Sequence, residues 1–334
     1  MWLAISVALT SCGDGAAPPA KVERGSAPVD QVALDRAERC LSVGRIEEAT
    51  VLAARLVHEA PSDWRVHDLV ARLRLRQSIL LGQQGLDAQA TEEAAAATAA
   101  YRHALALAPD VAGLHQSAGD TATRAGELDF AQQCYERCLA LDPQNVRALL
   151  CLSQLVEATD RAQAVELLTQ AIALDRSIPE GYAALAVIRA KQGDRDAALS
   201  ALETAIELDR ASLVVRLAQA RVFRIIGDPQ AGVEVLAALS PEALQDESIA
   251  WELSACWSAL GRHDQVIDVW AGLVAGHPNR WDRWKWAIRA LEAARRAGDE
   301  PQAAAMAELA RRSGAPEEAV RDALHTTATQ VDKP

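Results

Sequence analysis

Aromatic residues and clusters of positive charge are scarce in this chain. Aromatic residues make up only 4% of its 334 residues, which argues against a β-sandwich or barrel, since such folds need aromatic and β-branched residues in alternation. Asp and Glu outnumber Lys and Arg by 46 to 34, giving a formal net charge of −12 without any basic block. Because phosphate binding needs clustered Lys and Arg, we expect no nucleic-acid partner. Hydrophobic residues still make up 50% of the chain, enough to form a core.

The first segment of the chain is apolar but too short to cross a membrane. Residues 1–10 fall far short of the ~20 residues that a membrane-spanning helix needs. The segment leads into Leu9-Thr10-Ser11-Cys12, an aliphatic residue, two small residues and a cysteine, which resembles the lipobox of bacterial lipoproteins. The resemblance implies a signal segment at 1–11, a lipid on Cys12 and a flexible tether at 12–29. The alternative is a frayed apolar N-terminus on a cytoplasmic protein, which the lack of Lys and Arg before the apolar stretch favours.

A repeat with a period near 34 residues runs through the rest of the chain. Four related segments begin 34, 33 and 34 residues apart, at Ala104, Cys138, Ala171 and Ala205. Within 114–145, small and apolar residues recur at helical spacing on both sides of Gly126, where the chain must turn back. Asp142-Pro143 ends the second stretch, since proline does not continue a helix. Each unit is therefore predicted to be an antiparallel helix pair, which buries its apolar face only by stacking on its neighbours.

These residues resemble the tetratricopeptide repeat (TPR), a 34-residue helix–turn–helix unit. The unit that begins at Pro179 carries the family's small and large apolar residues at Tyr182, Leu185, Ala186, Gly193, Ala198, Leu202 and Ala205. The resemblance implies an all-α fold, an α-solenoid of about eight antiparallel helix pairs over residues 30–331. The predicted units are 30–63, 64–111, 112–145, 146–178, 179–212, 213–246, 247–280 and 281–314, followed by a C-terminal capping helix at 315–331. The unit at 64–111 is about 14 residues too long for the 34-residue repeat, and we expect its helices to be extended.

Motifs of catalysis and metal binding are missing from the sequence. It contains no Gly-rich phosphate loop, no His-Glu-x-x-His pattern and no Gly-x-Ser-x-Gly pattern, and the repeats leave no residues for a catalytic domain. Cys134 and Cys138 share one predicted helix face and Cys151 follows nearby, but they lack the spacing and further ligands of a zinc site. We interpret these cysteines as small hydrophobic residues at close helix contacts. We therefore expect no enzyme, no cofactor, no metal site and no small-molecule substrate.

Tryptophan is concentrated in one segment, with six of the eight residues between 251 and 286. Trp257, Trp270 and Trp284 fall at core positions of the repeat. Trp251 falls one residue past a core position, on the side that faces the groove in this family, and exposed Trp is a common binding anchor. The other positions that the register places on the groove are Gln116, Asp120, Gln154, Val187, Lys191, Arg221, Arg224, Lys285 and Arg289.

Arg221 and Arg224 lie three residues apart on one predicted helix face. This spacing suits a carboxylate-bearing ligand, and the alternative is a solvated face. The carboxylate clamp of TPR cochaperones, formed by Lys and Asn in consecutive units, is not reproduced, so we do not predict recognition of a chaperone's C-terminal tail.

Together the two resemblances imply a non-enzymatic protein–protein interaction scaffold of the bacterial cell envelope. Anchored through Cys12 on the periplasmic side of a membrane, it would receive a partner protein or peptide in its concave groove, as TPR lipoproteins of secretion, pilus or outer-membrane machinery do. The alternative is a soluble cytoplasmic TPR adaptor without a lipid anchor.

Overall fold

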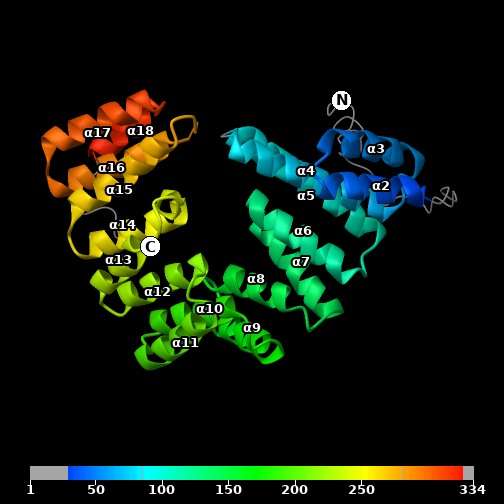
Figure 1. Ribbon diagram of the computed structural model, residues 1–334, viewed down its shortest axis with the longest axis horizontal. Helices are drawn as coiled ribbons and strands as arrows, with labels where there is room; N and C mark the ends of the chain where they lie inside the picture. The colour runs from blue at the N-terminus through cyan, green and yellow to red at the C-terminus, as the bar shows by residue number, and fades with distance from the viewer. Residues whose placement is uncertain (1–28, 85, 281, 326–334) are drawn as a thin grey trace. The chain divides into compact units, whose positions relative to one another are not determined.

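The computed structural model describes residues 29–84, 86–280 and 282–325, and these ranges contain helices, turns and no strand. The protein divides into two compact units at Cys151 and Leu152. The first unit contains the helix pairs α2 (Gln31–Ser42) with α3 (Ile46–Glu59), α4 (Trp64–Gln83) with α5 (Asp87–Leu107), and α6 (Ala112–Ala125) with α7 (Leu128–Leu141) (Figure 1). Helix α8 (Val146–Val156) crosses the boundary and is followed by α9 (Arg161–Leu174).

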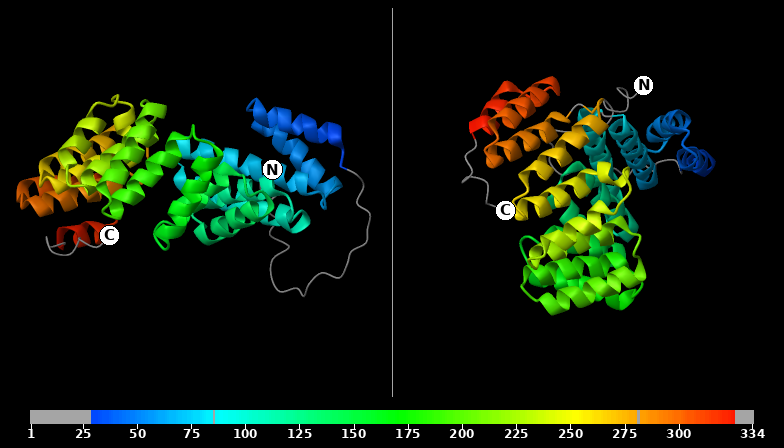
Figure 2. Two further views of the ribbon diagram at one scale, coloured as in Figure 1. Left: turned by 90° about the horizontal axis from the view of Figure 1, so that it is seen from below. Right: turned by 60° about the vertical axis from the view of Figure 1, so that its left-hand side comes forward.

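The second unit continues the same arrangement of helix pairs (Figure 2). Its further pairs are α10 (Pro179–Lys191) with α11 (Arg195–Leu208), α12 (Leu213–Ile225) with α13 (Pro229–Ala237), α14 (Glu247–Ala259) with α15 (His263–Gly276), and α16 (Trp284–Ala297) with α17 (Glu300–Arg312). A short 3₁₀ turn, η1 (Ala243–Gln245), precedes α14. The prediction of an all-α fold built from repeated helix pairs is confirmed, and each predicted repeat contains two of the described α-helices.

A last helix, α18 (Glu317–His325), packs against α16 and α17 at the end of the second unit. Val320 and Ala323 of this helix are buried in the apolar cluster of the final pair. It covers a face of the final pair that no other described helix covers, which is the role expected of a capping helix. The described helix is shorter than the predicted 315–331, and residues 326–331 lie outside the described part of the protein.

Local sequence signals set the turn inside each pair. Gly126 ends α6 with a φ of +78°, a left-handed conformation that glycine adopts without a Cβ clash. The second helix of a pair commonly begins with an aspartate cap, as where the Asp160 carboxylate accepts a hydrogen bond from the backbone N–H of Gln163 at 2.9 Å. Equivalent caps begin α11, α13 and α17 at Asp194, Asp228 and Asp299.

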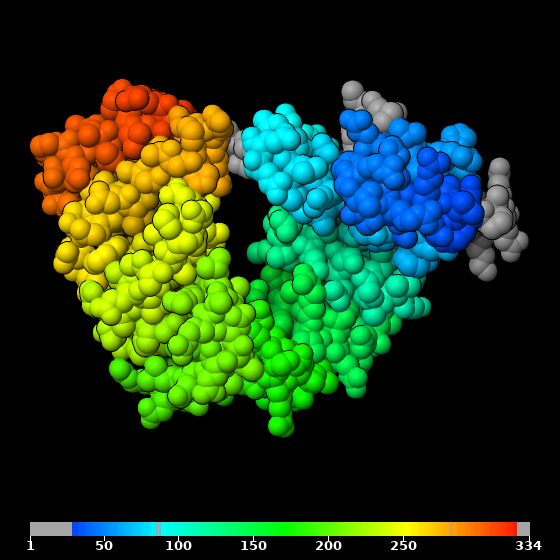
Figure 3. All heavy atoms as spheres, viewed as in Figure 1, coloured from blue at the N-terminus to red at the C-terminus, as the bar shows by residue number. Residues whose placement is uncertain are grey.

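Small side chains allow the helices of a pair to approach closely. Ala118 and Ala122 of α6 and Ala131 of α7 are fully buried. In the space-filling view of Figure 3, consecutive helices touch along the visible face of each unit. Cys134 and Cys138 of α7 are free and buried. Burial raises the pKa of the Cys134 thiol to about 12, so this thiol stays protonated at neutral pH. Within the described residues no cluster of His, Cys, Asp or Glu is arranged to hold a metal ion.

The extra residues of the 64–111 repeat lengthen both of its helices, to 20 residues in α4 and 21 in α5. Polar contacts join the extended parts. Arg74 is buried and its Nη1 lies 3.2 Å from Glu93 Oε2, and the Ser78 hydroxyl donates to the Ala90 carbonyl at 2.6 Å. These contacts satisfy polar groups that burial would otherwise leave at a cost.

No helix among the described residues is both long and apolar enough to span a bilayer. The predicted signal segment at 1–11 and all but the last residue of the predicted tether at 12–29 lie outside the described residues. Lipidation at Cys12 therefore stays a prediction.

Candidate functional site

Five of the predicted groove residues lie on three consecutive first helices of the second unit. Arg221 and Arg224 lie on α12, Trp251 on α14, and Lys285 and Arg289 on α16. Helices α12 and α14 pack against each other, and side chains of α14 and α16 are in contact. We call the surface formed by these five residues and Glu252 the first-helix face.

Glu252 of α14 holds the two arginines of α12. Arg221 Nε donates to Glu252 Oε2 at 2.9 Å, and Arg224 Nε donates to Oε1 at 2.6 Å. Glu252 is only 4% exposed, whereas the side chains of Arg221 and Arg224 are 40% and 30% exposed. A buried carboxylate therefore fixes two cations that reach the surface, and it leaves the cluster with one surplus positive charge.

Trp251 lies on the same helix as Glu252, one residue before it, and is 46% exposed. Its ring meets the buried ring of Trp270 edge to face, with centroids 5.1 Å apart and an interplanar angle of 81°. On the other helix the Arg289 guanidinium carbon lies 4.7 Å from the centroid of the Trp251 ring. The indole is thus held between two side chains while nearly half of its residue surface stays open to solvent.

The two cations of α16 also have acidic neighbours. Arg289 Nη1 lies 3.4 Å from Glu292 Oε2, and Lys285 Nζ lies 3.7 Å from Asp282 Oδ2. Both cations are about half exposed, so each pair contributes little to stability. Arg289 and Lys285 still contribute to the long-range attraction of a charged partner.

Gln116 and Asp120 lie on α6 in the first unit and are engaged by residues of that unit. The Asp120 carboxylate accepts hydrogen bonds from the Tyr135 hydroxyl at 2.8 Å and from Arg147 Nε at 2.9 Å. Gln116 Oε1 accepts one from Asn145 Nδ2 at 2.8 Å. Burial raises the pKa of Tyr135 well above its usual value, so this tyrosine remains a hydrogen-bond donor.

The remaining predicted groove positions differ in exposure. Gln154 of α8 is exposed, and Lys191 Nζ lies 2.5 Å from Glu157 Oε1 at the surface of the second unit. Val187, in contrast, is buried in the apolar cluster of α10, α11 and α12. The repeat register alone therefore does not predict which of these side chains reach solvent.

Sequence reasoning missed Glu252, the residue that organises the first-helix face. Its signal was present, since Glu252 directly follows Trp251 and lies 31 and 28 residues after the two arginines, in the next repeat. A residue at this offset lies on the neighbouring first helix, within reach of Arg221 and Arg224. The sequence did not predict that this carboxylate is buried, because glutamate is mostly found exposed to solvent.

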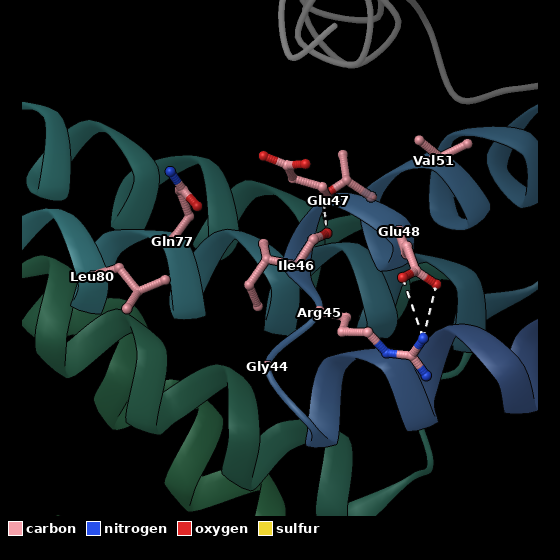
Figure 4. Close-up of a pocket in the computed structure, with 9 residues that line it drawn as sticks. Gly44, Arg45, Ile46, Glu47, Glu48, Val51, Gln77 and Leu80 are labelled. Carbon is pink, nitrogen blue, oxygen red and sulfur yellow. Dashed lines mark hydrogen bonds and ion pairs between the residues drawn. The ribbon is translucent and has the colours of Figure 1, made fainter.

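A separate cleft of about 880 Å³ lies in the first unit at the start of α3, beside the C-terminal half of α4 (Figure 4). Ile46, Val51 and Leu80 line it together with Gln77 and the Arg45–Glu48 ion pair, whose nitrogen lies 3.2 and 3.3 Å from the two carboxylate oxygens. The extended helix α4 forms one wall of this cleft. None of the predicted groove residues lines it.

Comparisons with known proteins agree with this repeat architecture. The family model of the tetratricopeptide repeat matches residues 112–145 and 179–212, which are two of the eight predicted units. The protein therefore carries TPR repeats in both of its compact units. A comparison with curated protein sequences finds no match.

Solved structures with a similar fold include PilW, described as a widely conserved type IV pilus biogenesis factor. It matches with a TM-score of 0.51 at 17% identity, over 68% of this chain and 99% of that chain. The Cut9–Hcn1 hetero-tetramer of the APC/C matches with a TM-score of 0.51 at 13% identity, over 88% of this chain and 55% of that chain. A pilF protein of Pseudomonas aeruginosa matches with a TM-score of 0.46 at 18% identity, over 62% of this chain and 88% of that chain. At these identities the similarity to PilW and Cut9–Hcn1 shows the fold alone.

Proposed function

We propose that this protein is a non-enzymatic interaction scaffold that binds a partner protein or peptide on its first-helix face. One observation carries the proposal, namely the position of Trp251. A large aromatic side chain that is half exposed, yet fixed by Trp270 and Arg289, loses little conformational entropy when a partner covers it. Residues of this kind dominate the energetics of protein interfaces.

The fold supports the same conclusion at a coarser level. Stacked TPR helix pairs present a preformed surface that typically binds other proteins, and such repeats act as scaffolds. The charged groups of the first-helix face form ion pairs, either with one another or with acidic neighbours on the chain, rather than an array of nucleophile and base. Binding is a sufficient role for this surface, and it requires no cofactor, no metal and no small-molecule substrate.

Partner binding on this face can be tested by photo-crosslinking in the cells that produce the protein. A photoreactive residue at Ser248, one turn before Trp251 on α14, should capture a discrete partner. Substitution of Trp251 by Ala should abolish this adduct. The matched control is Leu208→Ala, because Leu208 is 41% exposed but lies on the second helix α11. Equal yields of the adduct from the two variants would contradict the proposal.

The bacterial cell envelope is the proposed location, with the protein anchored through a lipid on Cys12 and facing the periplasm. The support is the Leu9-Thr10-Ser11-Cys12 sequence and the Gly- and Pro-rich residues after it. The alternative remains a soluble cytoplasmic adaptor with no anchor.

Acyl labelling separates the two locations. Cells grown with labelled palmitate should incorporate the label into the wild-type protein and not into the Cys12→Ala variant. The wild-type protein should also fractionate with membranes. Wild-type protein that is unlabelled and recovered in the soluble fraction would overturn the envelope location and leave the adaptor.

A further inference from the structure

The arginine pair of the first-helix face has unused hydrogen-bonding capacity. Both guanidinium groups reach Glu252 through Nε, and no described residue accepts a hydrogen bond from the Nη nitrogens of Arg221 or Arg224. Each guanidinium is a planar fork whose terminal donors match the two oxygens of a carboxylate. The pair therefore presents several oriented donors to solvent.

Glu252 fixes the orientation of the two arginine side chains and so preorganises them for binding an anionic group. The carboxylate is buried and receives one arginine on each oxygen, so the orientation of both forks is set before a ligand arrives. Its single charge does not neutralise two guanidinium groups. An anionic group arriving at the Nη donors therefore meets a net positive and preorganised site, at low entropic cost.

Trp251 and Arg289 define what must lie next to that anionic group. Trp251 lies on α14, the helix that carries Glu252, and its exposed indole offers a surface on which an apolar side chain of the ligand can pack. Arg289 lies over the same ring from α16, so cations are present on both the α12 side and the α16 side of the indole. A free C-terminal carboxylate would lie on one side of the indole only, whereas an internal acidic segment supplies carboxylates on both sides.

We propose, on the basis of the proposed binding function, that Arg221, Arg224, Trp251 and Arg289 recognise an acidic peptide segment. In this segment an aromatic or aliphatic residue is flanked by aspartate or glutamate on both sides. The net charge of −12 on the whole protein disfavours binding of such a partner elsewhere, and the surplus positive charge of the Arg221–Arg224–Glu252 cluster directs it to this face.

The test measures binding of the full-length protein to a fluorescent peptide with blocked ends, in which a phenylalanine lies between two glutamates on each side. Fluorescence anisotropy should show saturable binding that weakens as salt concentration rises. The double variant Arg221→Gln/Arg224→Gln should bind at least ~10-fold more weakly. The matched control is Arg216→Gln, an arginine of the same helix whose Nε is bonded to the Arg210 carbonyl. Circular dichroism melts of each variant confirm that it is folded.

A second double variant, Arg221→Lys/Arg224→Lys, keeps both charges and removes the forks. We expect it to lose most of the affinity, because an ammonium group does not reproduce bidentate contact with a carboxylate. Wild-type affinity in this variant would overturn the receptor geometry. Equal binding of the peptide in which glutamine replaces glutamate would overturn the acidic ligand.

Two further outcomes would overturn the choice of an internal acidic segment. One is tighter binding of a peptide whose only carboxylate is a free C-terminus, and the other is displacement of the acidic peptide by inorganic phosphate at equal concentration. The crosslinking experiment tests the proposed function independently of the peptide. If the Ser248 crosslink is lost in Trp251→Ala, the binding face is supported even when the acidic peptide fails to bind. If the peptide binds but the crosslink persists in Trp251→Ala, only the proposed function is refuted.

Discussion

Two carboxylates on first helices, Asp120 in the first unit and Glu252 in the second, differ in their own burial and in the number of arginines that they bind. Asp120 lies partly exposed and divides its oxygens between the buried Tyr135 hydroxyl and a largely exposed Arg147. Glu252 is buried and uses both oxygens on two arginines that reach the surface. In the first case the carboxylate completes the packing of a helix pair, and in the second it prepares cations for a partner.

The comparison extends to equivalent repeat positions. The fifth residue of the repeat is Gln116 in one unit and Trp251 in another, and the ninth is Asp120 in one unit and Arg221 in another. Repeat position therefore sets the face on which a side chain lies. It does not set the chemistry of that face. Equivalent helices therefore carry a carboxylate bonded within the packing of the first unit, and a carboxylate that holds two partly exposed arginines in the second unit.

Removing the two carboxylates should separate the regions most clearly. Glu252→Ala leaves two arginines directed at a buried space, and we expect the free energy of unfolding to fall by about 3 kcal/mol, at the low end for a buried pair because the arginines can rehydrate. Asp120→Ala leaves the Tyr135 hydroxyl without this acceptor and should cost about 1 kcal/mol. Urea unfolding of both variants gives the two values. A larger loss for Asp120→Ala would invert the comparison.

Glycine substitutions in α6 test the packing behind Asp120 without changing any charge. A Cβ on Gly119 would lie 2.7 Å from the Tyr135 ring, so Gly119→Ala should destabilise the protein by about 2 kcal/mol through overpacking. Gly113 of the same helix has no atom within 4 Å of an added Cβ, and Gly113→Ala is the matched control. Thermal melts should show a lowered midpoint for Gly119→Ala alone. Equal midpoints would mean that Tyr135 moves aside at no cost.

Exchange of Trp251 for the glutamine found at the equivalent position of α6 should separate stability from binding. Because the indole is nearly half exposed, Trp251→Gln should cost only about 1 kcal/mol of unfolding free energy. It should nevertheless remove the Ser248 crosslink. Trp270→Ala, which empties the buried position beneath it, should cost about 3–5 kcal/mol. Similar losses from the two variants would show that Trp251 serves the core.

The smallest expected effect is a pH dependence carried by the first unit. His103 of α5 stacks on His67 of α4 with ring centroids 5.8 Å apart, and burial, with a smaller contribution from the charge of His67, lowers the pKa of His103. The unfolded state then binds more protons than the folded one, so stability decreases as pH falls from ~7 to ~5. His103→Gln should flatten this part of the profile in denaturant titrations. An unchanged profile would assign the pH dependence to other groups.

Much of the fold could be predicted from the sequence because it follows from local signals. Turn glycines such as Gly126, the aspartate caps and the small residues at helix contacts act within one repeat, and the family model independently matches two of the repeats that they define. The candidate site was predictable only in part. The residues Arg221, Arg224 and Trp251 were identified from the register, whereas the burial of Glu252 and of Val187 was not.

The sequence by itself determined the helix pairs, their turns and their number, since a period near 34 residues admits few other ways to bury one apolar stripe per helix. Tertiary structure alone decided which polar side chains meet across neighbouring first helices. Those contacts depend on how one pair packs against the next, to within the few ångströms that separate an ion pair from two solvated charges. That packing places one buried carboxylate against two arginines in the second unit, and it leaves Trp251 of the same helix nearly half exposed.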